Sequence, residues 1–515
     1  MGSVASSQST LEGRSSREAD GLWQGHPALP VVALALLGTL SALVYGVVIV
    51  HPAGLLQWWG RPLVDLYGLA QQDPGMLLSL VSAFVALGAL YLLAWLAARA
   101  ARGEAAWVAV AGGFLVSAGL LLFLYPYDAA DLFDYILHGR ILGVHGANPF
   151  LQVGADFPGD PFRTYAGWVN FPTAYGPLWV LPTGALAALA GDGIVANVIA
   201  FKLLVGAYLA GSIGLVAAIL RRVAPERALA GVLLLAWNPL VLYETLGHGH
   251  NDIAVAFWIL AATWALVCRR YALSILALAA GALTKYIPVL LIPAAGAIAL
   301  RDLPGQHARR RFLLTAGLGG ILLVVAAYAP FWHGIETLGV GLREGLYTAS
   351  LPAFFFVLLS SPLGEGAAAQ VISLAAAGLT GLFALWQAGR AWQERSWWSF
   401  PQAALHILAF YLLLACLWFQ QWYAVWLVGL AALLPPGGSA FFGIAFGFAV
   451  LVKPLILEPL WLWIRPFPDR WWREVRLGPA VMATPWLLAL GAMVHDRWRG
   501  AHPSSPSPFE GRGKG

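Results

Sequence analysis

Long apolar runs, separated by short polar clusters, follow one another along nearly the whole chain. A helix needs about 20 apolar residues to cross a hydrocarbon core of roughly 30 Å, so these runs predict membrane-crossing helices. The first run exceeds the apolar core of a signal peptide, about 7 to 15 residues, and lacks a small-residue cleavage site, which predicts a retained span. The predicted spans are 29–50, 76–98, 107–124, 228–246, 253–268, 273–284, 287–300, 312–331, 367–386, 403–418, 423–434, 441–457 and 479–494.

Arginine clusters orient this stack, because Lys and Arg in short loops mark the cytoplasmic side of a membrane protein. The clusters place both termini in the cytoplasm and the 126–171 loop outside. Region 171–220 must then make one net crossing although it holds two apolar runs, so one run is expected to be re-entrant or interfacial. The clusters contain Arg14, Arg17, Arg99, Arg102, Arg221, Arg222, Arg227, Arg269, Arg270, Arg301, Arg309, Arg310, Arg311, Arg390, Arg395, Arg497 and Arg499.

Composition agrees with this pattern, since 60% of the 515 residues are hydrophobic, 11% are charged and the mean hydropathy is +0.73. These values lie outside the range of soluble domains and predict an all-α, polytopic transmembrane bundle of about 13–15 membrane segments. The net charge of +5 is spread over short clusters rather than one basic face, which argues against a nucleic-acid partner. Cys268 and Cys416 fall toward opposite sides of the membrane, so no disulfide is expected.

The domain organisation follows directly. Residues 1–28 form a cytoplasmic tail, and residues 29–496 form a single transmembrane domain that includes the outer 126–171 loop. Residues 497–515 are rich in Pro, Ser and Gly and predict a disordered tail. The expected location is the plasma membrane of a bacterium.

Five polar segments fall at the outer ends of the predicted helices. Pro, Gly and Asn divide the 126–171 loop into short pieces. Because all five segments lie on one side of the stack, we expect them to form one polar face. The segments are 124–150, 245–252 ("TLGHGHND"), 283–288 ("LTKYIP"), the loop holding Glu336, Arg343 and Tyr347, and 418–426 ("WFQQWYAVW").

The first of these segments carries an acidic stripe. Asp131, Asp134 and His138 recur on one side of a predicted helix, with Asp128 one turn earlier and apolar residues opposite. This pattern predicts an interfacial helix whose apolar side rests on lipid or the bundle and whose stripe faces a cavity. Alternatively, Asp128 caps the helix and the other acids favour its positive end. A cap needs only one acid, however, and acids at the rim of an apolar bundle are costly.

The order and spacing of several motifs resemble the GT-C class of membrane glycosyltransferases, and within it the polyprenol-phosphate-mannose-dependent α-(1→6)-mannosyltransferases. The stretches are "DLFDYILHGRILGVHGANPF", "GDPFRTYAGWVNFPTAYGPLW" and "WNPLVLYETLGHGHND". The extra acids Asp128 and Asp134 and the extra His248 depart from the family pattern. The matched positions are Asp131, Phe133, Tyr135, Gly139, Arg140, Asn148, Pro149, Phe150, Asn238, Pro239, Leu240, His250, Asn251 and Asp252.

The resemblance implies transfer of a sugar, most simply mannose, from a polyprenyl-phosphate donor to a cell-envelope glycolipid or glycan. A phosphate monoester leaves with little need for protonation, because its second pKa is about 6. One carboxylate can therefore suffice as a base for the acceptor hydroxyl, with inversion at C1. We assign Asp131 this role, with Asp128 as its rival, and expect Asp128 and Asp134 to raise the pKa of Asp131.

The remaining candidates bind substrate. Arg140, Lys285 and Arg343 are candidate phosphate contacts, although Lys285 at a helix end is also explained by snorkelling. Gln420, Gln421 and Tyr423 suit sugar binding, or belong to the interfacial aromatic belt. His248, His250 and Asp252 could hold a metal, or else Asn251 or Asp252 caps the next helix and the histidines line a cavity. We expect no cofactor and activity that survives chelation. Asp134, Tyr135, Asn148 and Tyr175 complete the predicted substrate-binding set.

A transporter or flippase of a lipid-linked saccharide is the main alternative. Such proteins carry ionisable groups near mid-membrane and show paired, broken helices in related halves. Here the charges gather at one set of helix ends and no internal repeat is visible. A purely structural subunit is a third possibility, but it has no use for an acidic stripe.

Overall fold

The computed structural model describes residues 28–62, 73–339 and 350–451, with single positions elsewhere (26, 64, 66, 69, 347, 487 and 491). Several predictions fall outside these residues: most of the N-terminal tail, the role of Arg343, the 479–494 span and the C-terminal tail. Within the described residues the chain is helical, and the sole β-type pairing is an isolated bridge between Gly54 and Leu124. The predicted all-α class is therefore confirmed.

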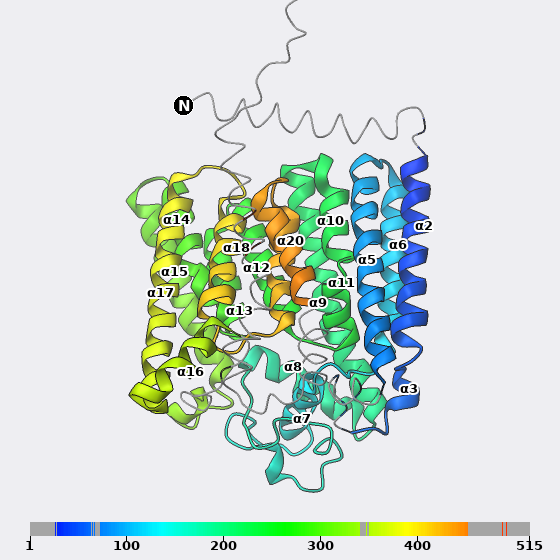
Figure 1. Cartoon of the computed structure of the whole chain (residues 1–515). Helices are drawn as coiled ribbons and strands as arrows, with labels where there is room; N and C mark the ends of the chain where they lie inside the picture. Colours follow the sequence, from blue (N-terminus) through cyan, green and yellow to red (C-terminus); the bar gives the residue numbers. More distant parts are fainter. Residues whose placement is uncertain are drawn as a thin grey trace, which may run out of the picture.

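The first half of the described chain builds long helices and one compact polar region. Short 3-10 or π-helical pieces carry the label η (Figure 1). In chain order the elements are α2 (Leu29–Leu43), η1 (Val44–Val50), α3 (Leu55–Trp58), α5 (Pro74–Ala100), α6 (Glu104–Leu122), α7 (Asp131–Gly143), η2 (Gly154–Asp156), α8 (Pro177–Ala190), α9 (Ile194–Val223), η3 (Pro225–Arg227), α10 (Ala228–Ala236), α11 (Pro239–Leu242) and η4 (Tyr243–Gly247).

The second half contains shorter helices around two long ones. Cys268 and Cys416 form no disulfide. The elements are α12 (Asp252–Val267), α13 (Tyr271–Ala282), η5 (Ile287–Leu291), α14 (Ile292–Asp302), α15 (Gly305–Tyr328), η6 (Ile335–Leu338), α16 (Leu351–Leu363), α17 (Glu365–Gln393), α18 (Ser399–Phe410), η7 (Tyr411–Ala415), η8 (Gln421–Ala424), α19 (Val425–Leu433) and α20 (Gly438–Leu451).

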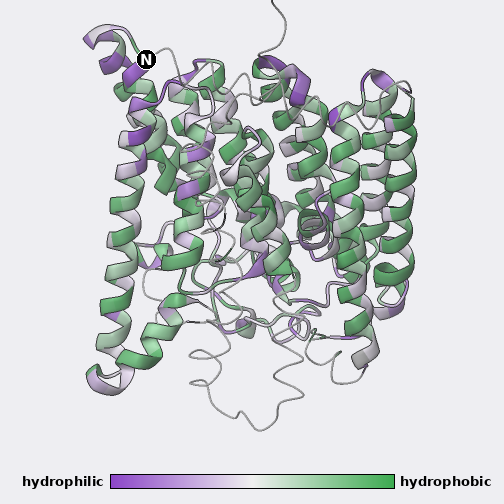
Figure 2. Ribbon diagram, turned by 45° about the horizontal axis from the view of Figure 1, so that its top comes forward, coloured by the Kyte–Doolittle hydropathy of each residue, from purple (hydrophilic) through white to green (hydrophobic). Residues whose placement is uncertain are grey.

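Six of the described helices are long and apolar enough to cross a membrane: α2 with η1, α5, α6, α9, α15 and α17. A seventh candidate is the pair α10 and α11 with η4, which bends by 48° at its break. Seven further apolar helices have 10 to 17 residues, fewer than the about 20 that a full crossing needs. Hydrophobic residues dominate the long helices, whereas hydrophilic residues gather at helix ends and inside the bundle (Figure 2). The chain is a polytopic membrane protein.

Region 171–220 contains one long helix and one short one. The 30 residues of α9 are enough for a full crossing, whereas the 14 residues of α8 are not. Helix α8 instead packs on α7, at the end of the bundle opposite the start of α2 (Figure 1). Helix α8 is therefore the better candidate for the run in 171–220 that was expected to be re-entrant or interfacial.

Two glycines allow α7 and α8 to approach closely. A β-carbon at Gly139 would lie 2.7 Å from the Thr183 carbonyl oxygen, and one at Gly143 would lie 1.9 Å from the Gly184 oxygen. Glycines four residues apart share one face of a helix, which lets two backbones touch. The segment from Leu132 to Ile141 is consequently buried on all sides. Of the predicted acidic stripe on α7, Asp131 is half-buried, whereas Asp134 and His138 are buried.

Candidate active site

Four carboxylates from distant parts of the sequence gather between α7 and the α10–α12 region. Asp128 and Asp131 lie before and at the start of α7, Glu244 lies on η4, and Asp252 begins α12. Asp128, Asp131 and Asp252 are all close enough to Glu244 to interact with it electrostatically. We call these four residues the acidic centre. Glu244 and Asp252 are fully buried.

The local sequence explains the short, irregular helical segment that carries Glu244. Asn238 caps α11 by accepting a hydrogen bond from the Val241 N–H at 3.2 Å, and Pro239 occupies the first turn, where it costs no backbone bond. The helix then widens into the π-helical segment η4, a geometry that is frequent at functional sites. Gly249 ends it with a φ of +77°, which only glycine adopts easily.

Asp128, Glu244 and His248 form the tightest group within this region. One ligand atom from each side chain lies within 4.8 Å of the other two. The Gln421 amide donates a 3.0 Å hydrogen bond to Asp128 Oδ2 and so joins η8 to the start of α7. Both carboxylate oxygens of Glu244 are buried, and neither has a partner at the distance and angle of a hydrogen bond.

The two histidines of "HGHND" occupy different surroundings. His248 Nδ1 lies 3.1 Å from the Tyr243 carbonyl oxygen, and burial together with nearby Lys202 lowers the pKa of His248 to about 3. His250 stacks on Trp422, with ring centroids 3.8 Å apart, and its Nε2 lies 3.3 Å from Glu244 Oε2. Burial also lowers the pKa of His250, so both imidazoles are neutral.

Lys285 lies at the other side of the acidic centre. Its ammonium donates a 2.8 Å hydrogen bond to Asp252 Oδ1, which also accepts one from the Trp426 indole at 2.8 Å. The ammonium lies 4.3 Å from the ring centroid of Tyr423 and 5.7 Å from that of Tyr175. This aromatic cage holds Lys285 at a fixed place, which simple snorkelling to the membrane surface does not explain.

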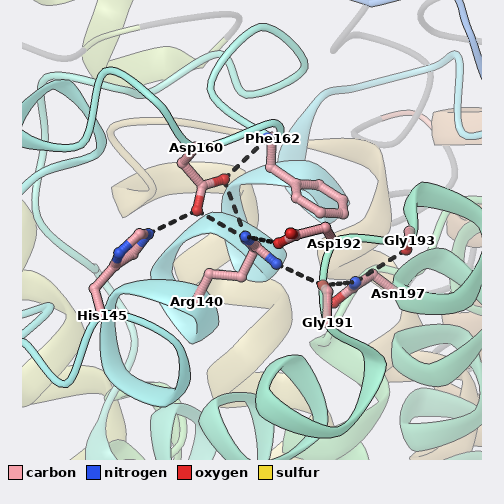
Figure 3. Close-up of polar contacts among 8 residues, drawn as sticks. All are labelled: Arg140, His145, Asp160, Phe162, Gly191, Asp192, Gly193 and Asn197. Atoms are coloured by element: carbon pink, nitrogen blue, oxygen red, sulfur yellow. Dashed lines mark hydrogen bonds and ion pairs between the residues drawn. The ribbon is translucent and has the colours of Figure 1, made fainter.

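Arg140 lies in a second polar group, shown in Figure 3. Its Nε donates to both oxygens of Asp160, at 3.1 and 2.8 Å, and its Nη2 donates to Asp192 at 2.7 Å. His145 Nε2 lies 2.8 Å from the same Asp160 carboxylate. We call Arg140, His145, Asp160 and Asp192 the anchor cluster. It ties α7 to the outer loop and to the turn between α8 and α9.

The structure therefore separates Arg140 from the acidic centre. Besides these two acids, Arg140 donates to the Gly191 carbonyl and stacks its guanidinium 5.0 Å from the Phe162 ring centroid. With its donors engaged in this way, the side chain serves the fold. The prediction that Arg140 contacts the phosphate does not fit this placement.

Other predicted residues hold the outer loop. Asp134 accepts a 2.8 Å hydrogen bond from the Trp168 N–H, and His138 Nε2 lies 3.1 Å from the Phe171 carbonyl oxygen. The Asn148 amide donates to the Phe331 carbonyl at 2.8 Å and so joins the loop to the end of α15. The predicted acidic stripe is thus divided, with Asp128 and Asp131 in the acidic centre and Asp134 on the loop.

The remaining candidates lie near Lys285 or on its flanks. Tyr175 donates a 3.2 Å hydrogen bond to the Tyr135 hydroxyl, and burial raises the pKa of Tyr135, which keeps that phenol protonated. Gln420 is half-buried and precedes η8, whereas Asn251 is fully buried and precedes α12. The N-cap residue of α12 is Asn251, and its side chain makes no capping hydrogen bond, so capping by Asn251 is not observed.

Sequence reasoning missed Glu244, Trp422 and Trp426. Glu244 stands within an apolar run, and an ionisable residue in such a run is a functional candidate by its cost alone. That signal was present in "WNPLVLYETLG". The two tryptophans gave no comparable signal, because the sequence around them reads equally well as an interfacial aromatic belt.

Comparisons with known proteins agree with the motif resemblance. A family model described as "Alpha-(1->6)-mannopyranosyltransferase, N-terminal domain" matches residues 34–301, just over half of the 515-residue chain. Alpha-(1->6)-mannopyranosyltransferase A from Corynebacterium glutamicum is 27% identical over 133 residues, which are 26% of this chain and 27% of that protein. No solved structure matches. All of the acidic centre lies within the matched residues, which favours a glycosyltransferase over a transporter. The chain belongs to the α-(1→6)-mannopyranosyltransferase family.

Proposed function

We propose that this protein is an inverting glycosyltransferase that moves mannose from a polyprenyl-phosphate donor to a glycolipid or glycan acceptor of the cell envelope. The observation that carries the proposal is the acidic centre, with buried Glu244 and Asp252, beside the caged Lys285, in a membrane chain of this family. This reaction requires a carboxylate that accepts the proton of the acceptor hydroxyl. It also requires a cation that stabilises the negative charge of the departing phosphate.

Asp131 is the proposed base. It is half-buried at the first position of α7 and occupies the position that the family motif matches. The acceptor hydroxyl oxygen forms a bond to C1 of the sugar from the face opposite the phosphate, and its proton passes to the Asp131 carboxylate. The bond from C1 to the phosphate oxygen breaks, and the phosphate monoester keeps the electron pair. A β-linked donor therefore gives an α-linked product.

Lys285 is the proposed protein cation for the phosphate. One of its three donors is used by Asp252, which leaves the others for a ligand. The neighbouring rings of Tyr175, Tyr423 and Trp426 exclude water from the ammonium and strengthen its attraction for an anion. The amides of Gln420 and Gln421 and the Asn251 side chain are the proposed partners of sugar hydroxyls.

Reconstitution tests the reaction directly. The purified protein is placed in liposomes with polyprenyl-phosphate [14C]mannose and an envelope lipid extract as the acceptor source. We expect label to move into a product that resists mild acid, which cleaves the glycosyl phosphate. Label that crosses the bilayer while still attached to the polyprenyl phosphate would instead identify a flippase, and label that does neither would reject both activities.

The active site is proposed to face the outside, with both termini in the cytoplasm. Asp156 in the 126–171 loop and Arg310 near the start of α15 are both exposed. In a variant without Cys268 and Cys416, a cysteine at 156 should react with an impermeant maleimide added to intact cells. A cysteine at 310 should react only after permeabilisation. Labelling of both in intact cells would refute this orientation.

A further inference from the structure

The acidic centre contains a buried carboxylate, Glu244, that no Lys or Arg of the described residues contacts. Of its four carboxylates, Asp252 is bonded to Lys285. The nearby Lys202 does not contact Glu244, because its ammonium donates to the carbonyls of Leu121, Leu122 and Leu124. Arg140 is held in the anchor cluster. Buried carboxylates are costly unless they are paired or bound to a metal, so this region calls for another cation.

The geometry of three side chains fits one ion. Divalent cations bind carboxylate oxygens and imidazole nitrogens at about 2.0–2.4 Å, so two ligand atoms on opposite sides of an ion are separated by up to about 4.8 Å. One ligand atom each from Asp128, Glu244 and His248 lies within 4.8 Å of the others. A single ion can therefore contact all three after small side-chain adjustments.

The orientation of His248 is an independent sign of a ligand. Because a carbonyl oxygen only accepts, Nδ1 carries the proton that it shares with Tyr243, which leaves the lone pair on Nε2. Nε2 is buried and has no hydrogen-bond partner. An imidazole that donates from one nitrogen to a backbone carbonyl and leaves the other bare has the usual arrangement of a metal-binding histidine.

The Glu244 side chain also indicates a bound ligand. The side chain is 0% exposed, and both of its oxygens lack a hydrogen bond. The nearest histidine, His250, approaches to 3.3 Å but without hydrogen-bond geometry, because its ring is stacked on Trp422. The Gln421 amide also lies near Glu244 but donates to Asp128. A carboxylate in this state gains most from an ion at its bare oxygens.

We propose that Asp128, Glu244 and His248 bind one divalent cation of the Mn²⁺ and Zn²⁺ class. Two carboxylates and one imidazole suit these ions better than Ca²⁺, which prefers oxygen ligands alone. Three protein ligands leave coordination positions open for the oxygens of a phosphate. That second role rests on the proposed function, whereas binding of the ion does not. The expectation of activity without metal depended on Arg140 and Lys285 together at the phosphate, and of these two only Lys285 lies beside the acidic centre.

Mn²⁺ is the probe, because protein-bound Mn²⁺ loses the sharp electron paramagnetic resonance signal of the free ion. The purified, EDTA-treated full-length protein is titrated with Mn²⁺ in detergent, without donor or acceptor. The variants are Glu244→Gln and His248→Gln, with His145→Gln as the matched control, since His145 also contacts an acid but lies in the anchor cluster. Pulsed spectra report whether an imidazole nitrogen is coupled to the ion.

We expect one Mn²⁺ per wild-type chain, with imidazole coupling that disappears in His248→Gln. Both site variants should bind at least tenfold more weakly, while His145→Gln should bind like wild type. Absence of stoichiometric binding to the wild type, or absence of imidazole coupling in it, would overturn the proposal even if a variant failed to fold. Wild-type affinity in a folded Glu244→Gln or His248→Gln protein would overturn it as well.

Discussion

The anchor cluster and the acidic centre are both polar groups near α7, yet they are built differently. In the anchor cluster, Arg140 binds both oxygens of Asp160, and the same carboxylate also contacts His145 and the Phe162 N–H. In the acidic centre, Glu244 has two oxygens without hydrogen bonds, and His248 has a bare nitrogen. The first group is satisfied by the protein itself, whereas the second has buried polar atoms without hydrogen-bond partners.

This difference separates structural from functional charges. A buried group whose partners are all supplied by the fold stabilises the fold and has little left to offer a ligand. A buried polar group without hydrogen-bond partners raises the free energy of the folded protein. Such groups are typical of sites where binding or chemistry uses them. The predicted residue Arg140 belongs to the first kind, and the unpredicted residue Glu244 belongs to the second.

Removal of Arg140 should give the largest loss of stability. Arg140→Leu leaves Asp160 buried without its cation, which costs about 3–5 kcal/mol for a broken buried pair. Thermal unfolding in detergent, followed by light scattering and intrinsic fluorescence, measures the effect. Arg140→Lys keeps the charge and should lose less. Unchanged stability in Arg140→Leu would show that the anchor cluster does not hold the fold.

Gly143→Ala should be the next most severe change. Its new methyl group would lie 1.9 Å from the Gly184 carbonyl oxygen, so α7 and α8 must move apart, at a cost of about 1–3 kcal/mol. Gly159→Ala is the control, because nothing lies within 4 Å of a β-carbon at that position. The same unfolding assay compares them. If both alanines had equal stability, the close contact between α7 and α8 would be in doubt.

Asp134→Asn should have the smallest effect. The amide oxygen can still accept the hydrogen bond from the Trp168 N–H, so the loss is limited to about 1 kcal/mol of charge assistance. Turnover in the mannose-transfer assay should stay within tenfold of wild type. A loss as large as that expected for the base would place Asp134 in the chemistry and remove the distinction between loop-holding and reacting acids.

Much of the fold could be predicted from the sequence, because apolar runs and arginine clusters carry the membrane pattern directly. The pattern also predicted a helix at α7 and one run within 171–220 that does not cross. It could not predict that α7 is buried on all sides. That burial depends on Gly139 and Gly143 meeting α8, and the glycine spacing was a readable but unused signal.

The candidate site was less predictable, because partners decide what a charged residue does. Arg140 and Asp131 lie in one motif. Arg140, however, donates hydrogen bonds to Asp160 and Asp192, which are 20 and 52 residues away in the sequence. Helical spacing grouped Asp134 with Asp128 and Asp131, whereas the fold of the outer loop separates them. Glu244 was hidden because the apolar run around it was interpreted only as a span.

The central claim is that Asp131 in the acidic centre takes the proton from the acceptor. Turnover of Asp131→Asn with saturating polyprenyl-phosphate mannose and Mn²⁺ tests it most directly, with Asp134→Asn as the matched control. The amide keeps the size of the side chain but removes its basicity, so turnover should fall about 100-fold or more while the KM for the donor changes little. Near-normal turnover in Asp131→Asn, together with abolished turnover in Asp128→Asn, would contradict the account and move the base to Asp128.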